Sequence, residues 1–279
     1  MSRRAYVAAA REAAARALAE DLAGYGDLAG GVFAGDGVAR VMAREEGVLS
    51  GSEAFCATAE LVDPALRTEF TVADGERFAA GAPLATLSGP LAGILAAERT
   101  GLNFLCRLSG VATLTAAYVA ETSGTRARIA ATRKTTPGLR ALEKEAVVHG
   151  GGTPHRFGLF DGAMIKDNHV AAAGGVAAAV DLVRSAAAHV HSVEVEVDTL
   201  EQLDEALAAG AAIVLLDNMD TTTVRTAVQR VAGRALVEVS GGVRLEHVRE
   251  LAETGADIIS VGALTTRAPW LDLALDLEA

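Results

Sequence analysis

The second half of the chain alternates apolar runs with amphipathic segments. The apolar runs lie at residues 193–197, 211–218, 235–242 and 256–264. Runs of this length are typical of buried strands, and the segments between them have the apolar spacing of surface helices. Strands and helices that alternate in this way indicate a parallel β/α architecture.

The predicted helices also carry start and stop signals. Thr199 is followed three residues later by Gln202, which is a capping-box pattern. Leu203 and Leu207 then fall on one face, and Gly210 follows as a left-handed stop. These signals predict a helix over 199–210, and similar patterns predict helices after the next two strands.

Polar residues interrupt the apolar runs at a regular interval. Glu196 and Asp217 are 21 residues apart, and Glu238 follows Asp217 after another 21. Ser260 comes 22 residues after Glu238, and Glu194 shares a face with Glu196 because side chains alternate along a strand. An unpaired polar group in a buried strand costs about 1–3 kcal/mol. A common role for these residues therefore explains the set better than chance.

Cationic residues follow two earlier strand-like runs. The run "ARIAA" leads into Thr132, Arg133 and Lys134, and the run "GAMI" leads into Lys166. In a β/α barrel the carboxyl ends of the strands converge on one mouth, where catalytic groups sit. We therefore expect these cations to face the later carboxylates. The alternative is that each acid caps the following helix or pairs with a surface lysine.

The charge of the chain limits the partners of this cationic region. The formal net charge is -11 and the pI is near 5.0, yet residues 131–169 are rich in Lys, Arg and His. Binding a nucleic acid or an anionic membrane needs a broad basic surface, which an acidic chain of this kind lacks. The region is therefore expected to bind a small anion at a local site.

A mouth with cations on one side and carboxylates on the other indicates a definite chemistry. Arginine and lysine suit carboxylates and phosphates, and Mg²⁺ takes one or two carboxylates together with substrate phosphate oxygens. Glycine-rich turns at 240–242 and 261–264 follow the last two strands, at the usual phosphate position of a barrel. The residues thus predict a metal-assisted enzyme that acts on a phosphorylated sugar and a small polycarboxylate.

Other features indicate a cytoplasmic protein. Cys56 and Cys106 have no CxxC spacing and are expected to be reduced thiols. Acidic residues interrupt the arginines of the N-terminal segment, which argues against a transit peptide. The sequence has no run of 18 apolar residues, so no membrane span is expected. His189 and His191 precede a strand on its amino side and are expected to be structural.

A series of motifs in order resembles the quinolinate phosphoribosyltransferase family. The motifs are "AERTGLNFLCRLSGVAT" at 97–113, "ATRKTTPGLRALEKEAVVHGGGTPHRFGL" at 131–159, "IKDNHV" at 165–170, "VEVEV" at 193–197, "LLDN" at 215–218 and "SGG" at 240–242. The resemblance extends over nearly the whole chain, from "EDLAGYGDL" at 20–28 to "SVGALT" at 260–265.

This resemblance implies a fold and a domain organisation. It implies an N-terminal α/β sandwich domain over residues 1–112 and an incomplete, about six-stranded parallel α/β barrel over 113–267. The C-terminal segment 268–279 is expected to pack back on the N-terminal domain. The resemblance also implies a homodimer in which Arg99 reaches the site of the partner subunit.

The implied reaction joins quinolinate to phosphoribosyl pyrophosphate. Its products are nicotinate mononucleotide, pyrophosphate and carbon dioxide, as a step of NAD synthesis. By similarity, the residues that bind the two substrates are Arg99, Thr132, Arg133, Lys134, His155, Arg156, Lys166, Ser240, Gly241 and Gly262. Within this set, five residues concern quinolinate, namely Arg99, Arg133, Lys134, His155 and Arg156. The last four of the set concern the phosphoribosyl group and its phosphates. The implied catalytic residues are Lys134, Lys166, Glu196 and Asp217, and the last two would also organise Mg²⁺.

Some residues of the cationic region are expected to lie outside the site. The segment 138–151 is predicted to form a helix on which Arg140, Lys144 and His149 are solvated or pair with neighbouring glutamates. The sequence also departs from the family pattern, at Ala29, Glu145 and the tripeptide 265–267. Two other functions remain open at this point: a phosphoribosyltransferase with a different acceptor, and a non-catalytic phosphosugar-binding protein.

Overall fold

The computed structural model describes residues 1–187 and 191–278, and these form two compact units. The first unit consists of residues 1–116, 135–151 and 264–279, and the second of 117–134 and 152–263. Residues 135–151 thus belong with the N-terminal part of the chain, although they fall inside the range 113–267 expected for the barrel. His189 lies outside the described residues.

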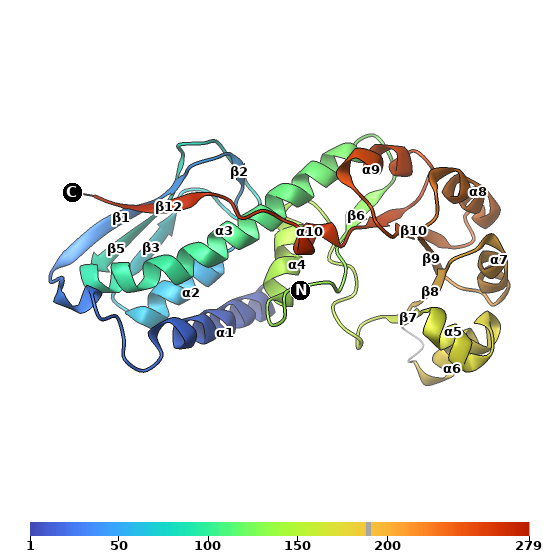
Figure 1. Ribbon diagram of the computed structural model, residues 1–279, viewed down its shortest axis with the longest axis horizontal. Helices are drawn as coiled ribbons and strands as arrows, with labels where there is room; N and C mark the ends of the chain where they lie inside the picture. Colours follow the sequence, from blue (N-terminus) through green and yellow to red (C-terminus); the bar gives the residue numbers. More distant parts are fainter. Residues whose placement is uncertain (188–190, 279) are drawn as a thin grey trace. The chain divides into compact units, whose positions relative to one another are not determined.

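The first unit contains an antiparallel sheet with the strand order β12-β1-β5-β3 (Figure 1). Its strands are β1 (Asp36–Ala43), β3 (Arg67–Phe70), β5 (Pro83–Pro90) and β12 (Leu273–Leu277). A two-stranded sheet pairs β2 (Gly47–Val48) with β4 (Arg77–Phe78). The C-terminal strand β12 pairs with β1, so the end of the chain completes the sheet of the N-terminal part.

The same unit contains several helices. They are α1 (Arg3–Leu22), η1 (Gly30–Val32), α2 (Ser52–Val62), α3 (Leu91–Glu121) and α4 (Arg140–His149). Of these, α2 and α3 share a hydrophobic core with the sheet, as expected for an α/β sandwich. One hydrophobic core joins Phe55 of α2, Leu87 of β5 and Leu105 of α3, all of which are at most 1% exposed. Burial of such side chains contributes about 1.5–3 kcal/mol each, which explains why the helices pack on the sheet.

Helix α3 is long and apolar enough, by length and composition, to cross a membrane, although the sequence reading expected no such segment. Within the described residues, 61% of its most apolar window is buried inside the structure. A core helix has these same properties, because it must be apolar on most of its circumference. The feature is therefore weak evidence for a membrane span.

Of the two interpretations of Lys144, solvation and pairing with a neighbouring glutamate, the structure contradicts solvation. Helix α4 does form, but Lys144 is 1% exposed and Glu143 is fully buried. The Glu143 carboxylate accepts hydrogen bonds from Arg107 at 2.7 Å and from the backbone N–H of Thr136 at 2.9 Å. These residues are buried because α4 packs against other elements of the first unit, including α1. This packing covers a face of α4 that carries polar residues.

The second unit is built on a six-stranded parallel sheet with the order β6-β11-β10-β9-β8-β7 (Figure 1). The strands are β6 (Arg128–Ala130), β7 (Ala163–Ile165), β8 (Val193–Val197), β9 (Ile213–Asp217), β10 (Leu236–Ser240) and β11 (Ile258–Ser260). Strands β6 and β7 form the two edges of the sheet. The predicted incomplete barrel of about six strands is confirmed.

Helices line one face of this sheet. They are α5 (Asp167–Ala173), α6 (Val176–Ala186), α7 (Leu200–Ala208), α8 (Thr221–Val231) and α9 (Leu245–Ala252), and the short α10 (Ala263–Thr266) follows β11. The predicted cap of α7 is confirmed, because the Thr199 hydroxyl accepts from the backbone N–H of Gln202 at 3.2 Å. Alternate strand residues such as Val195, Val214 and Val239 are at most 1% exposed and form the sheet–helix core.

On the face of the sheet opposite the helices, the strand register aligns residues of neighbouring strands in rows, which we call levels. Glu196 pairs in register with Leu215, which in turn pairs with Glu238, so these residues occupy one level of the sheet. Asp217 pairs with Ser240 one level nearer the carboxyl ends of the strands. Paired residues in a sheet point to the same face, so the regular spacing of polar residues in the sequence does bring them together.

Candidate active site

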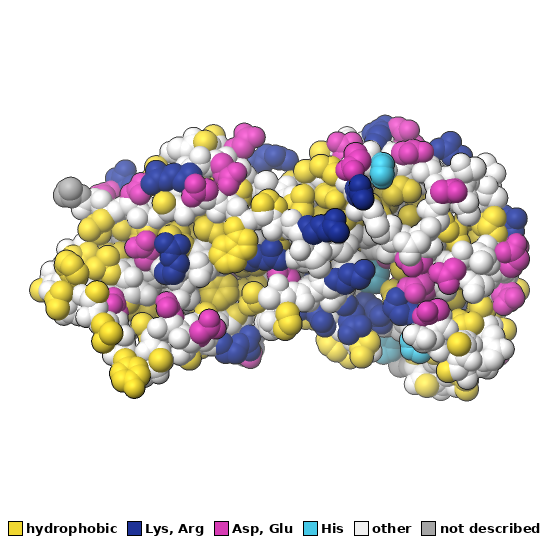
Figure 2. Space-filling view, in the orientation of Figure 1, with side chains coloured by type: hydrophobic (Ala, Val, Ile, Leu, Met, Phe, Trp, Pro, Cys, Tyr) yellow, Lys and Arg dark blue, Asp and Glu magenta, His cyan; other side chains and the backbone are white. Residues whose placement is uncertain are grey.

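A cavity of about 370 Å³ opens at the carboxyl ends of the strands of the second unit. Its lining residues are Ala131, Thr132, Arg133, Lys134, His155, Arg156, Met164, Lys166, Glu196, Leu215, Asp217, Glu238, Ser240 and Ser260. On the visible face, Lys and Arg side chains gather next to Asp and Glu side chains near β7 and β8 (Figure 2). The predicted cations and carboxylates therefore face a common space, whose volume suits a small ligand.

The loop after β6 supplies one cationic wall of the cavity. The Thr132 hydroxyl accepts a hydrogen bond from the backbone N–H of Lys134 at 3.1 Å, which orders the start of the loop. Between them, the Nε atom of Arg133 is buried and has no hydrogen-bond partner among the described residues. A buried guanidinium donor without a partner costs free energy, so this position favours an anionic ligand.

Arg156 supplies a second guanidinium in the same cavity. It donates a hydrogen bond from Nη1 to the Gly162 carbonyl at 3.0 Å, and its Nη2 lies 3.4 Å from the Met164 sulfur. Burial, followed by the positive charge of Arg133, lowers the pKa of Arg156. Two arginines that repel each other across a shared cavity are stabilised when an anion lies between them.

Carboxylates form the opposite side of the cavity. Lys166, at the end of β7, makes an ion pair with Glu196 of β8. Asp217, at the end of β9, accepts a hydrogen bond from the side-chain amide of Asn218 at 2.6 Å. Glu196 and Asp217 are oxygen donors on neighbouring strands of one cavity, and this donor set fits Mg²⁺, which takes one or two carboxylates and fills its remaining positions with substrate oxygens and water.

Glycines shape the turns after β10 and β11. Gly241 has a φ of +95°, and a Cβ atom there would lie 2.3 Å from the Asn218 side-chain oxygen. A Cβ at Gly262 would lie 3.1 Å from Cδ of Lys134. Both positions therefore favour glycine, because the backbone must pass close to a neighbouring group. Ser240, which precedes Gly241, lines the cavity.

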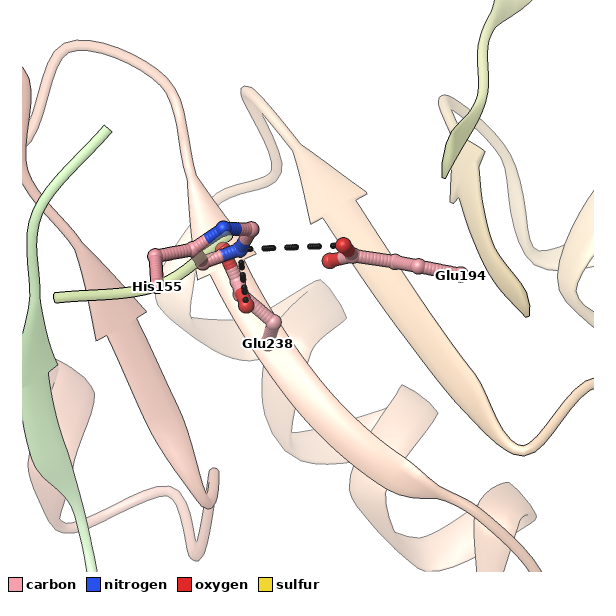
Figure 3. A group of neighbouring side chains, drawn as sticks. All are labelled: His155, Glu194 and Glu238. Atoms are coloured by element: carbon pink, nitrogen blue, oxygen red, sulfur yellow. Dashed lines mark hydrogen bonds and ion pairs between the residues drawn. The ribbon is translucent and has the colours of Figure 1, made fainter. Parts of the chain in front are cut away.

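A buried acidic pair lies deeper in the same unit (Figure 3). Glu194 of β8 and Glu238 of β10 are 5% and 2% exposed, and both point toward His155. Burial, followed by the nearby Glu238, raises the pKa of Glu194 to about 8. Sequence reasoning noticed both glutamates but assigned neither to the site. The signal for them was the shared strand face of Glu194 and Glu196 and the regular spacing of Glu238.

Three predicted site residues do not line this cavity: Gly241, Gly262 and Arg99. Arg99 is the one of them that lies outside the second unit. It belongs to the first unit, where it lines a separate cavity of about 560 Å³ together with Arg16, Asn103, Arg107 and other residues. The remaining predicted residues lie in the second unit, and all of them except Gly241 and Gly262 line the cavity.

Comparison with protein families identifies the chain. Residues 28–109 match the family model for the N-terminal domain of quinolinate phosphoribosyl transferase, and residues 111–276 match the model for its C-terminal domain. The chain belongs to the quinolinate phosphoribosyltransferase family. The two models together span most of its length, in agreement with the order of motifs in the sequence.

Individual members of this family are similar over almost the full chain. The carboxylating nicotinate-nucleotide pyrophosphorylase of Mycobacterium leprae is 46% identical, over 96% of this chain and 97% of the relative. The solved structure of the nicotinate-nucleotide pyrophosphorylase from Francisella tularensis has a TM-score of 0.94 and 37% identity, and the match covers 98% of this chain and 97% of that one. A probable enzyme of the same name from Bacillus subtilis is 42% identical, over 86% of this chain and 83% of the relative.

Proposed function

We propose that this protein transfers the phosphoribosyl group of phosphoribosyl pyrophosphate to quinolinate, with loss of carbon dioxide, to give nicotinate mononucleotide and pyrophosphate. The observation that carries the proposal is the pair of neighbouring arginines, Arg133 and Arg156, in a cavity that also holds the carboxylates Glu196 and Asp217. A ring with two adjacent carboxylates requires such a pair of guanidinium groups. Membership of the quinolinate phosphoribosyltransferase family supports the same reaction.

In this function the cationic wall binds quinolinate. Arg133 and Arg156 each offer a planar fork that can hold a carboxylate through two hydrogen bonds, and Lys134 adds a point charge. The buried, unpartnered Nε of Arg133 gains an acceptor when the dicarboxylate binds. Thr132 orders the loop that presents these groups, through its hydrogen bond with the backbone of Lys134.

The opposite side of the cavity binds phosphoribosyl pyrophosphate. Ser240, which lines the cavity, the adjacent Gly241 and Gly262 of the next turn would supply hydroxyl and backbone groups for a phosphate, and the glycines would permit its close approach. Glu196 and Asp217 would hold Mg²⁺, which, when bound, offsets the negative charge of the pyrophosphate. Lys166 can move from its ion pair with Glu196 to the leaving pyrophosphate, because an ammonium on a flexible stem changes partners readily.

Catalysis then consists of positioning and charge stabilisation. The bond from the anomeric carbon to pyrophosphate breaks while the pyridine nitrogen of quinolinate attacks that carbon, and the transition state has oxocarbenium character. The quaternised ring is an electron sink, so the carboxylate beside the nitrogen leaves as carbon dioxide, and the ring carbon takes up a proton. No nucleophilic side chain is needed.

The assembly and location of the enzyme belong to the same proposal. By resemblance to the family, we expect a homodimer in which Arg99 of one protomer contributes to the quinolinate site of the other. We expect the protein to act in the cytoplasm. The presence of Cys56 and Cys106 as free thiols supports a reducing compartment.

The deciding experiment measures both products of the reaction. Purified protein with quinolinate, phosphoribosyl pyrophosphate and Mg²⁺ should release pyrophosphate and carbon dioxide in equal amounts, and a chelator should stop both. Nicotinate and other pyridine monocarboxylates, tested in parallel, should react far more slowly because they leave one arginine without a partner. Pyrophosphate release with another acceptor but not with quinolinate would indicate a different transferase. Binding of phosphoribosyl pyrophosphate without turnover of any acceptor would indicate a non-catalytic protein.

A further inference from the structure

His155 stands in an unusual backbone conformation beside Arg156. Its φ is +51°, in the left-handed region, which costs roughly 1–2 kcal/mol for a residue other than glycine. The backbone N–H of Arg156 donates a hydrogen bond to Nδ1 of the His155 ring at 2.7 Å. The ring therefore helps to hold the turn that presents Arg156 to the cavity.

This hydrogen bond decides where the imidazole carries its proton. Nδ1 of His155 accepts from a backbone N–H, so it carries no proton, and the proton of the neutral ring is on Nε2. Nε2 in turn lies 3.2 Å from Oε2 of Glu238 and 3.6 Å from Oε2 of Glu194 (Figure 3). The Nε2–H group donates to Glu238, whereas the Glu194 oxygen lies too far away to accept a hydrogen bond.

The same three side chains have the spacing of metal ligands, but the ring is in the wrong tautomer. The candidate ligand atoms of His155, Glu194 and Glu238 all lie within 4.8 Å of one another. A metal at Nε2 would require a lone pair there and a proton on Nδ1. That proton would point at the backbone N–H of Arg156, which already occupies the Nδ1 position as a donor. The arrangement is therefore one of hydrogen bonding.

The hydrogen bonds link Glu238 to the Arg156 guanidinium. Glu238 lies on β10 and is 2% exposed, so the rigid sheet fixes its carboxylate. Through the His155 ring, that carboxylate fixes the backbone of Arg156, whose guanidinium is held at its other end by the Gly162 carbonyl. Both ring nitrogens of His155 are engaged in this chain of contacts, so the ring has no further N–H to offer a substrate.

We propose that Glu238 is a positioning residue for quinolinate binding, which sets Arg156 in place through the Nε2–H tautomer of His155. The inference rests on the proposed function and changes one expectation drawn from the resemblance. His155 acts as an anchor for Arg156 and not as a direct ligand of the quinolinate carboxylates. Glu238 and His155 thus affect quinolinate through Arg156 alone, and phosphoribosyl pyrophosphate binding does not depend on them.

The first test compares Glu238→Met, which removes the acceptor, with Glu238→Gln, whose amide oxygen still accepts from Nε2–H. Glu238→Met should weaken quinolinate affinity about ten- to a hundredfold, as expected when a binding group is misplaced by about 1 Å. Its kcat and its KM for phosphoribosyl pyrophosphate should change less than about threefold, and Glu238→Gln should restore most of the affinity. Val214→Ala serves as the control for a general loss of stability, because it creates a cavity on the helix side of β9.

The second test asks whether Glu238 acts through Arg156. In an Arg156→Ala background, Glu238→Met should produce no further loss of quinolinate affinity, because the two residues belong to one chain of contacts. A Glu238→Met effect that is undiminished in this background would overturn the proposal. So would an unchanged quinolinate affinity in Glu238→Met, or an affinity loss in Glu238→Gln as large as that in Glu238→Met.

A third measurement separates this inference from the proposed function. NMR of ¹⁵N-histidine-labelled protein without substrates should show the His155 proton on Nε2, with the signal assigned by its absence in His155→Asn. Glu238→Met should shift that signal. A proton on Nδ1 in the native protein would refute the positioning mechanism even if the enzyme turns over quinolinate. If quinolinate is not a substrate, the NMR result still stands, and only the proposed function fails.

Discussion

Replacement of Glu194 by glutamine should make the protein more stable at neutral pH but not in mild acid. Glu194 is 5% exposed, and its pKa is raised from 4.5 to about 8 by burial and by the neighbouring Glu238. In the unfolded chain the same carboxyl ionises near its ordinary value. Folding at neutral pH must therefore place a proton on Glu194, and Glu194→Gln removes this requirement while keeping the shape of the side chain.

The size of the effect follows from the two pKa values. Below the unfolded pKa of 4.5 the carboxyl is neutral in both states, so the native protein has its full stability there. As the pH rises toward about 8, the unfolded state loses its proton while the folded state keeps it, and stability falls by about 1.4 kcal/mol per pH unit. Between about pH 5.5 and about pH 7.5 the native protein should lose roughly 2.5 kcal/mol relative to Glu194→Gln.

Urea denaturation of both proteins at several pH values in this range measures the effect. The difference between the two unfolding free energies cancels the titration of all other groups. Glu205→Gln, at an exposed position of α7, serves as the matched control and should give a difference that does not vary with pH. If the difference for Glu194→Gln is also constant, Glu194 is ionised in the folded protein and our account of the buried pair is incorrect.

Three further substitutions test other parts of the structure. Arg133→Ala should weaken quinolinate binding by about 2–3 kcal/mol in calorimetry, with an unchanged circular dichroism spectrum, because a charge-assisted donor pair is lost; unchanged affinity would remove Arg133 from the site. Gly241→Ala should raise the KM for phosphoribosyl pyrophosphate and cost about 1–3 kcal/mol of stability, since the new Cβ would strike the Asn218 side chain and φ is positive; a variant with native KM would show that the turn tolerates a side chain. Arg107→Met should cost about 3–5 kcal/mol in denaturant unfolding, because it leaves the fully buried Glu143 carboxylate without its cation; a loss below about 1 kcal/mol would mean that Glu143 finds another partner.

Local patterns predicted the second unit well. The alternation of apolar runs and amphipathic segments set the order of strands and helices from residue 193 onward, and the signals at Thr199 and Gly210 marked the bounds of a helix. The recurrence of Glu196, Asp217, Glu238 and Ser260 in successive runs was enough to place them around one cavity. Such patterns suffice because parallel strands joined by helices repeat one local geometry.

Contacts between distant segments were beyond such patterns. Lys144 and Glu143 look like members of a solvated helix face, yet both are buried by elements that lie far away in the chain. The family resemblance implied that residues 268–279 pack back on the N-terminal domain, but not that β12 pairs with β1, because strand pairing over such a separation leaves no local signal. No local pattern indicated a role for Arg99 either. Family similarity placed it in the site, but it lies in the other unit from the cavity.

The sequence alone therefore predicted the chemistry of the site, and the tertiary structure decided how its parts are held. Residue types and their spacing along the chain were sufficient to indicate two arginines for a dicarboxylate and two carboxylates for a hard metal ion. The tautomer of His155 and the raised pKa of Glu194 depend on burial and on distances of 3.2–3.6 Å between β8, β10 and a loop. Those quantities arise only when distant residues exclude water from a shared space, because electrostatic interactions strengthen as solvent is removed.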